Sequence, residues 1–133
     1  MKSELLRIDG IDYKKVLARV EDVRLEIEDH GILTLLVDLH KEEGLHQGFG
    51  MYSLDEWDEK LQRRKGTASG MDFVIQIMKV FGVNKLEDIK GKMCYALYRP
   101  DNALIKGIQA LEIDGGERFT IQEWCKLWGL KND

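Results

Sequence analysis

The sequence predicts an α+β fold in which an antiparallel sheet of about five strands carries one main helix, with short helices near both ends of the chain. Stretches that alternate apolar and charged residues predict the strands, and one long apolar stretch predicts the main helix. Short polar turns between the strands favour antiparallel pairing. We treat residues 1–133 as a single domain, because a chain of 133 residues buries a sizeable core without disulfides.

Composition narrows the functional classes. Hydrophobic residues make up 44% of the chain, charged residues 33%, and there is one proline, which is typical of a folded protein. The formal net charge of −4 disfavours a nucleic-acid polymer as partner, because a general coat of phosphates needs a basic surface. The apolar runs are shorter than the about 20 residues that cross a bilayer, so no membrane span is expected.

The N-terminal segment and the cysteines indicate the compartment. Residues 1–7 interleave acids and bases and lack the apolar stretch of a secretory signal, so we expect a cytoplasmic protein, in the host cytoplasm if a phage encodes it. Cys94 and Cys125 lie outside any CxxC or histidine-rich pattern, which favours reduced, structural thiols. No cofactor is expected.

The first half of the chain predicts a three-stranded antiparallel meander. Residues 12–20 carry apolar side chains at helical spacing, which favours a short helix, with a strand as the alternative. From 23 to 28 apolar and charged residues alternate as in a half-buried strand, and 28–31 supplies turn residues. Residues 32–39 are too apolar for a solvated strand, so we expect them at the centre of the sheet. A third strand is expected at 48–52.

The main helix follows a long charged connection at 55–65. Thr67 or Ser69 is expected to cap this helix, which runs to Phe81 and ends at Gly82. Its surface is apolar except for one narrow polar stripe, so it must be covered on more than one side. We expect a second subunit as part of that cover, which predicts a homodimer or higher homo-oligomer. The polar stripe consists of Asp72, Gln76 and Lys79.

The last third of the chain adds two strands and a final helix. A one-turn helix at 84–89 is followed by strands at 92–98 and 103–111, which the turn residues 99–102 join as a hairpin. Residues 120–123 form a capping box that opens the last helix.

A catalytic or metal site finds little support in the sequence. His30, His40 and His46 are the only imidazoles, and no nucleophile motif such as GxSxG surrounds a serine or cysteine. The spacing of His40 and His46 with the nearby acids matches no metal-ligand motif. We therefore assign no catalytic residue and no metal ligand.

A glycine-punctuated strand and a basic run suggest a ligand site instead. Gly48-Phe49-Gly50 is neither a phosphate-binding Walker loop nor a dinucleotide fingerprint, so it marks either a bulge or a close approach to a ligand. Flat rings stack on bases and guanidinium groups bind phosphates, and both occur here within a short stretch of sequence. The alternative places the rings in the core and the basic residues in solvent. The predicted ligand-binding residues are Phe49, Tyr52, Arg63, Arg64, Phe81, Lys106 and Asp114.

Several segments resemble a family of small phage and prophage proteins over residues 23–114. They are IEDHGILT (27–34), QGFGMYSLD (47–55), GTASGMDF (66–73), FGV (81–83) and LEDIKGK (86–92). The resemblance extends to the first family of Thoeris anti-defence proteins. It implies an oligomer, at least a dimer, that sequesters the cyclised ADP-ribose signal made by bacterial TIR-domain enzymes and leaves it intact. Some relatives are said to bind cyclic oligonucleotides at a separate site.

One departure from that family concerns the glycine-rich strand. Met51 stands where relatives more often have another glycine, which makes this stretch stiffer and changes the expected shape of the pocket. The expected function is sequestration of a cyclic nucleotide, because rings and cations are present without an activated nucleophile. Two alternatives stay open. The first is a small phosphodiesterase or nucleosidase with His46 or His30 as general base. The second is an inhibitor that binds a host protein through Trp57, Trp124 and Trp128.

Overall fold

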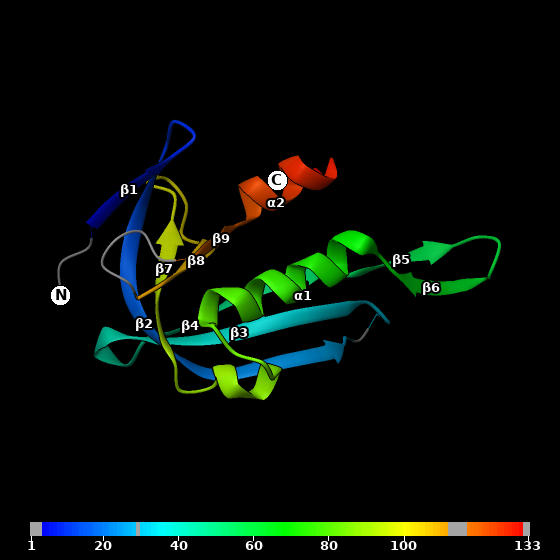
Figure 1. The fold of residues 1–133 in the computed structure, drawn as a ribbon, viewed down its shortest axis with the longest axis horizontal. Helices are drawn as coiled ribbons and strands as arrows, with labels where there is room; N and C mark the ends of the chain where they lie inside the picture. The colour runs from blue at the N-terminus through cyan, green and yellow to red at the C-terminus, as the bar shows by residue number, and fades with distance from the viewer. Residues whose placement is uncertain (1–3, 29, 112–116, 132–133) are drawn as a thin grey trace.

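The computed structural model describes residues 4–28, 30–111 and 117–131. In these residues the chain forms an α+β fold with one antiparallel sheet of seven strands, a separate two-stranded sheet and two α-helices (Figure 1). The α+β class is confirmed, and the main sheet has more strands than the predicted five. The elements are β1 (Glu4–Ile8), β2 (Ile11–Ile27), β3 (Leu33–Lys41), η1 (Glu42–Gly44), β4 (His46–Ser53), β5 (Asp55–Asp58), β6 (Arg63–Gly66), α1 (Ala68–Phe81), η2 (Leu86–Ile89), β7 (Met93–Tyr98), β8 (Ile105–Ala110), β9 (Arg118–Thr120) and α2 (Ile121–Trp128).

β2 is the strand that connects the two halves of the main sheet. The strands lie in the order β4-β3-β2-β7-β8-β9, and β1 pairs with the start of β2. Residues 14–19 of β2 pair with β7, and residues 18–27 pair with β3. Figure 1 shows β2 bending strongly along its length as it passes from one half to the other.

The predicted helix at 12–20 is wrong, because these residues belong to β2. β1 and β7 pair with this part of β2 on its two edges, and β1 is a strand that the sequence does not predict. Asp9 and Gly10 form the turn between β1 and β2 with positive φ angles of 50° and 78°. Hydrogen bonds to two neighbouring strands outweigh a weak helical spacing, so the alternative, a strand, is correct.

The meander predicted from the first half of the chain is confirmed by β2, β3 and β4. Gly31 closes the first turn by donating its N–H to the carbonyl of Glu28 at 2.9 Å. β3 lies between two neighbouring strands, as expected of a central strand. Its side chains Leu35, Val37 and Leu39 are completely buried.

The main helix has the predicted ends. The hydroxyl of Thr67 accepts the N–H of Gly70 at 2.9 Å, and Gly82 ends α1 in the left-handed conformation with φ of 65°. A Cβ added at Gly70 would overlap the backbone carbonyl of Leu54, which lies between β4 and β5. A glycine is therefore required where α1 contacts Leu54. The apolar side of α1 packs on one face of the main sheet (Figure 1). Its buried side chains are Phe73, Ile77, Val80 and Phe81.

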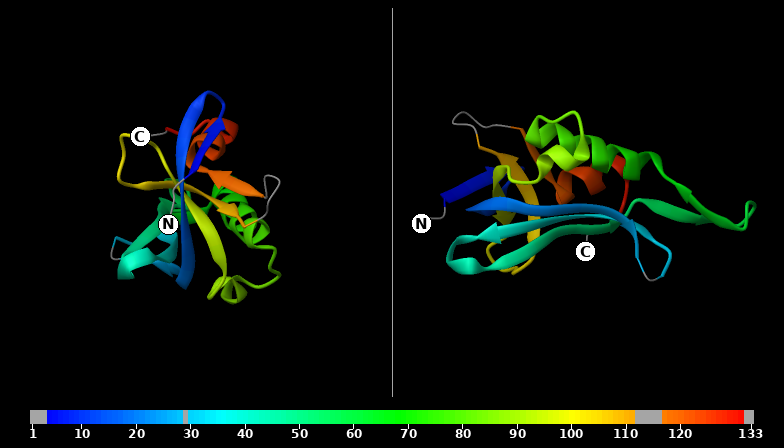
Figure 2. Two further views of the ribbon diagram at one scale, coloured as in Figure 1. Left: turned by 90° about the vertical axis from the view of Figure 1, so that its left-hand side faces the viewer. Right: turned by 90° about the horizontal axis from the view of Figure 1, so that it is seen from below.

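The stretch 55–65, predicted as a long charged connection, forms a β-hairpin. β5 and β6 pair antiparallel, with Trp57 opposite Arg64. Ion pairs of Arg64 with Asp55 at 2.9 Å and of Lys65 with Asp58 at 2.8 Å link the two strands, so charges that suggested a loop stabilise the hairpin. Figure 1 and the right-hand view of Figure 2 show this hairpin projecting beyond the end of α1.

The C-terminal elements are confirmed, with β9 as an unpredicted addition. β7 and β8 pair as a hairpin, η2 is the expected short helix, and β9 adds a strand next to β8. The hydroxyl of Thr120 accepts the N–H of Glu123 at 3.1 Å and so caps α2. Within the described residues, no helix combines the length and the apolar character that a membrane crossing requires.

Candidate functional site

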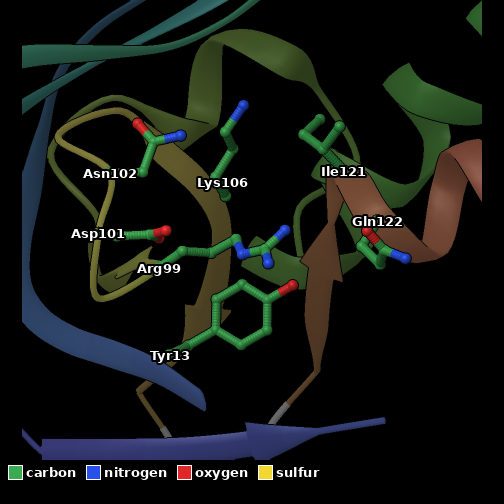
Figure 3. A pocket seen from close by; sticks show the side chains of 7 residues that line it. All are labelled: Tyr13, Arg99, Asp101, Asn102, Lys106, Ile121 and Gln122. Atoms are coloured by element: carbon green, nitrogen blue, oxygen red, sulfur yellow. The ribbon is translucent and has the colours of Figure 1, made fainter. Parts of the chain in front are cut away.

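A hollow of about 200 Å³ lies where the loop between β7 and β8 faces the start of α2 (Figure 3). We call it the Arg99 pocket. Its lining combines two cations with amide, hydroxyl and carboxylate groups. The lining residues are Tyr13, Arg99, Asp101, Asn102, Lys106, Ile121 and Gln122.

The β7–β8 hairpin brings the two cations together. Arg99 directly follows β7, and Lys106 belongs to β8. The turn between them is closed by the N–H of Asn102, which donates to the carbonyl of Arg99 at 3.1 Å. The side-chain oxygen of Asn102 accepts the N–H of Leu104 at 2.9 Å, which fixes the second half of the loop. A turn type that the sequence predicts therefore places both positive charges at one opening.

The start of α2 forms the opposite wall. Ile121 and Gln122 are the first two residues of this helix, and Thr120 caps it. The first N–H groups of an α-helix have no partner within the helix and carry partial positive charge. The wall therefore adds to the positive character of a pocket that already holds Arg99 and Lys106.

Tyr13 closes the pocket from the side of β2. Its ring is buried, and burial raises the pKa of the phenol, while the positive charge of Arg99 and a hydrogen bond with Thr120 act in the opposite direction. Figure 3 shows the Tyr13 hydroxyl and the Arg99 guanidinium extending in the same direction, toward the start of α2. At neutral pH this phenol is protonated, so it is a neutral polar group beside the cations.

The charge of the lining is positive overall. Two cations, Arg99 and Lys106, stand against one carboxylate, that of Asp101. Asp101 is exposed, whereas Lys106 is buried, so the carboxylate is the group that water screens. A small anion is the ligand class that fits such a lining.

Of the six predicted ligand-binding residues that the structure describes, only Lys106 lines the Arg99 pocket. Phe49 and Phe81 are buried in the core, and the ring of Phe49 stacks on Phe73 with centroids 6.2 Å apart. A Cβ added at Gly50 would overlap a carbonyl of β3, and the β3–β4 register shifts beside it. Gly50 therefore lies at a β-bulge, where its backbone packs against β3.

The remaining described residues of the predicted set lie outside the Arg99 pocket. Tyr52 is half-buried against Phe73, with centroids 6.1 Å apart. Arg63 is exposed on the β5–β6 hairpin, where Arg64 is held by Asp55. Asp114 lies outside the described residues. The structure does not bring the six described members of the predicted set together at one site.

Two other hollows contain side chains that pair with one another. In a hollow of about 570 Å³, the Lys41 amine donates to the side chains of Gln47 at 2.9 Å and Tyr98 at 2.8 Å. In another, of about 280 Å³ between α1, β9 and α2, Arg118 pairs with Glu123 at 3.1 Å. These pairings engage Lys41 and Arg118 within the protein.

The described residues contain no group of three or more His, Cys, Asp or Glu side chains that could hold a metal ion. His30 and His46 line none of the three hollows. Comparison with protein-family models, curated proteins and solved structures finds no match. The Arg99 pocket is therefore the candidate functional site.

Sequence reasoning missed most of this pocket. The sequence predicts a turn at Arg99, Asp101 and Asn102, and the cation at the start of this turn is the one local signal of the pocket. Tyr13 and Gln122 carry no local sequence signal of a site, because they reach the pocket only through long-range strand pairing and helix packing.

Proposed function

We propose that the protein binds and sequesters a small phosphate-bearing nucleotide, a cyclised ADP-ribose immune signal, without cleaving it. The observation that supports this most directly is the meeting of Arg99, Lys106 and the start of α2 at one hollow. The family resemblance of residues 23–114 favours the same ligand class.

The pocket chemistry suits a diphosphate. A guanidinium binds two phosphate oxygens in a fork, an ammonium adds a point charge, and helix N-termini favour anions. The side-chain amides of Asn102 and Gln122 supply donors and acceptors for ribose hydroxyls. About 200 Å³ is less than the roughly 300–1,000 Å³ of pockets that enclose a drug-sized ligand, so the diphosphate and a ribose are bound while the base lies at the rim.

The same lining favours binding over catalysis. Tyr13 is a neutral phenol, and Asp101 is exposed at the rim. The described lining contains no histidine, cysteine or serine that these groups could activate for hydrolysis. Sequestration needs tight binding of the unchanged ligand, and each site removes one molecule from solution.

Calorimetric titration with cyclised ADP-ribose isomers tests the proposal. Arg99→Ala is expected to weaken binding about tenfold or more, because hydrogen bonds to charged groups contribute about 1.5–3 kcal/mol. Arg63→Ala, which removes an exposed arginine elsewhere, is the matched control and is expected to bind normally. Ligand recovered intact after denaturation of the complex supports sequestration. A chemically altered ligand supports the enzyme alternative, and no binding by the wild type overturns the proposal.

A second candidate function is binding of a host protein through the β5–β6 hairpin. Trp57 is 50% exposed there and Leu61 is exposed in the same hairpin. Large exposed apolar side chains on a projecting element are typical of protein interfaces. Trp124 does not serve this purpose, because it is buried and donates its ring N–H to the carbonyl of Ser69 at 2.9 Å. Pull-down of a host protein that Trp57→Ala abolishes, while nucleotide binding persists, favours this candidate.

A further inference from the structure

The second half of β2 has one unpaired edge. Residues 14–19 pair with β7, and Val20 still exchanges backbone hydrogen bonds with Gly91 and Lys92, at 2.8 Å each. Beyond Val20, residues 22–27 pair with β3 on one side only, and no strand of the described residues pairs with the other side. An unpaired edge is a template for another strand.

Strand geometry defines which groups this edge presents. The N–H of Glu28 donates to the carbonyl of Ile32 at 3.0 Å, so the backbone of Glu28 faces the β3 side. Backbone direction alternates along a strand, so Val23, Leu25 and Ile27 present their N–H and C=O groups to the open edge. The N–H of Val23 is accepted by the carboxylate of its neighbour Asp22 at 2.9 Å, a local substitute for a missing strand. No proline lies in this segment to block pairing.

The side chains at this edge form an apolar surface. Leu25 is 46% exposed and Ile27 70% exposed, although they lie opposite Leu35 and Leu33 of β3 on the face that α1 covers. One side of α1 faces α2, where the carboxylate of Asp72 accepts the ring N–H of Trp128 at 2.9 Å. The other side of α1 carries apolar residues that are exposed or half-buried. These are Met71, Val74 and Met78.

We propose that a second copy of this chain pairs with the open edge of β2, antiparallel about a two-fold axis at Leu25. Leu25 then lies opposite the partner's Leu25, and Val23 opposite the partner's Ile27. Every outward N–H and C=O from 23 to 27 finds a partner in this register. The proposal does not depend on which ligand the Arg99 pocket binds.

Charge selects this register over its neighbours. On the opposite face of the strand, Arg24 and Glu26 lie side by side at 3.9 Å. The axis at Leu25 places Arg24 opposite the partner's Glu26, and Glu26 opposite the partner's Arg24. An axis at Arg24 or at Glu26 would place like charges directly opposite, which destabilises a ladder. Asp22 falls opposite the partner's Glu28, so like charges limit the ladder to residues 23–27.

The resulting assembly is closed. Both copies use the same edge, so the dimer leaves no open edge at β2 to which a third copy could pair. Leu25 and Ile27 of both copies form a central apolar strip, and α1 of each copy lies on the same face of the joined sheet. This arrangement supplies the second cover that the apolar surface of α1 requires.

Charge reversal tests the register. In sedimentation equilibrium, the wild-type chain is expected to have twice the mass of one chain. Arg24→Glu and Glu26→Arg are each expected to raise the dimer dissociation constant about tenfold, because symmetry creates two like-charged pairs from each substitution. The double variant is expected to restore dimerisation. Circular dichroism establishes that each variant is folded.

Cysteine cross-linking provides a second measurement in the wild-type charge background. Leu25→Cys is expected to form a covalent dimer under mild oxidation, because facing residues lie about 5.5 Å apart at Cα, within the range of a disulfide. Ile27→Cys and the exposed Leu5→Cys are expected not to cross-link. Cys94 and Cys125 are buried and give no background. The proposal is overturned if the wild-type chain sediments with the mass of one chain or forms assemblies of increasing size. It is also overturned if the dimer is unaffected by the charge reversals and Leu25→Cys does not cross-link.

Discussion

Arg64 and Asp55 form a two-pronged ion pair at the base of the β5–β6 hairpin. Nε and Nη2 of the guanidinium donate to the two carboxylate oxygens, each at 2.9 Å. The carboxylate also accepts the N–H of Leu33 and the hydroxyl of Ser53, both at 3.2 Å. One carboxylate thus joins the hairpin to β3 and β4, which explains why Arg64 serves the fold although its residue type suggested a phosphate ligand.

Asp55→Asn is expected to change the pH dependence of stability. Its hydrogen bond from Arg64 holds the pKa of Asp55 below the usual value of 3.8. The folded state therefore binds this proton less readily than the unfolded state, so the stabilisation is complete above pH 3.8 and is lost as pH falls through the lower, folded pKa. The variant should be less stable at pH 7 and lose less on acidification. Urea unfolding from pH 7 downward measures this, with the exposed Asp12→Asn as control.

Gly70→Ala is expected to destabilise the protein by about 1–3 kcal/mol, the usual cost of overpacking. A Cβ at this position would overlap the carbonyl of Leu54. Gly66→Ala is the matched control, because a Cβ there meets nothing within 4 Å. Urea titration of both variants gives the free energies of unfolding. Equal values for the two variants would contradict the tight contact between α1 and Leu54.

Phe49→Ala is expected to reduce the free energy of unfolding by about 3–5 kcal/mol, as for other large-to-small changes in a core. Its side chain is 1% exposed and packs against Phe73 and Phe119. Trp57→Ala, at an exposed aromatic residue, should leave stability nearly unchanged. Thermal melts distinguish the two variants. A stable Phe49→Ala protein that has lost ligand binding would support the stacking role expected from sequence.

Thr120→Ala is expected to destabilise the protein by about 0.5–2 kcal/mol, because it removes the cap of α2. Thr120→Ser retains the capping oxygen and is expected to preserve most of the stability. The same loss should weaken the Arg99 pocket, since Thr120 also hydrogen-bonds Tyr13. Comparing ligand affinity in the two variants at a temperature where both are folded measures that connection. Equal ligand affinities of the Thr120→Ala and Thr120→Ser variants would show that the cap of α2 does not affect the pocket.

Local signals in the sequence predict the elements that depend on neighbours in the chain. Thr67 and Gly82 define the ends of α1 through hydrogen bonds and a backbone conformation within a few residues, and both predictions are confirmed. The helix predicted at 12–20 is wrong because Lys14 pairs with Tyr98, a partner far along the chain. Helical spacing within 12–20 contains no information about that pairing.

The candidate site was less accessible to prediction for the same reason. Tyr13 and Arg99 meet only because β2 and β7 are neighbours in the sheet. Phe49 shows a second limit, since a ring between two glycines fits both a binding strand and a bulge. Only the register of β3 and β4 decides between them, by turning that ring into the core.

The placement of β2 between early and late strands affects how the chain matures during synthesis. β1 and β3 are neighbours of β2 in the sequence, so they are synthesised close in time to it. The first half of β2 also pairs with β7, which is synthesised much later. Such long-range closure slows folding, because loop entropy is lost before the contacts form. A nascent chain that has not yet reached Tyr98 exposes an unfinished sheet, and that interval is when it most needs a chaperone.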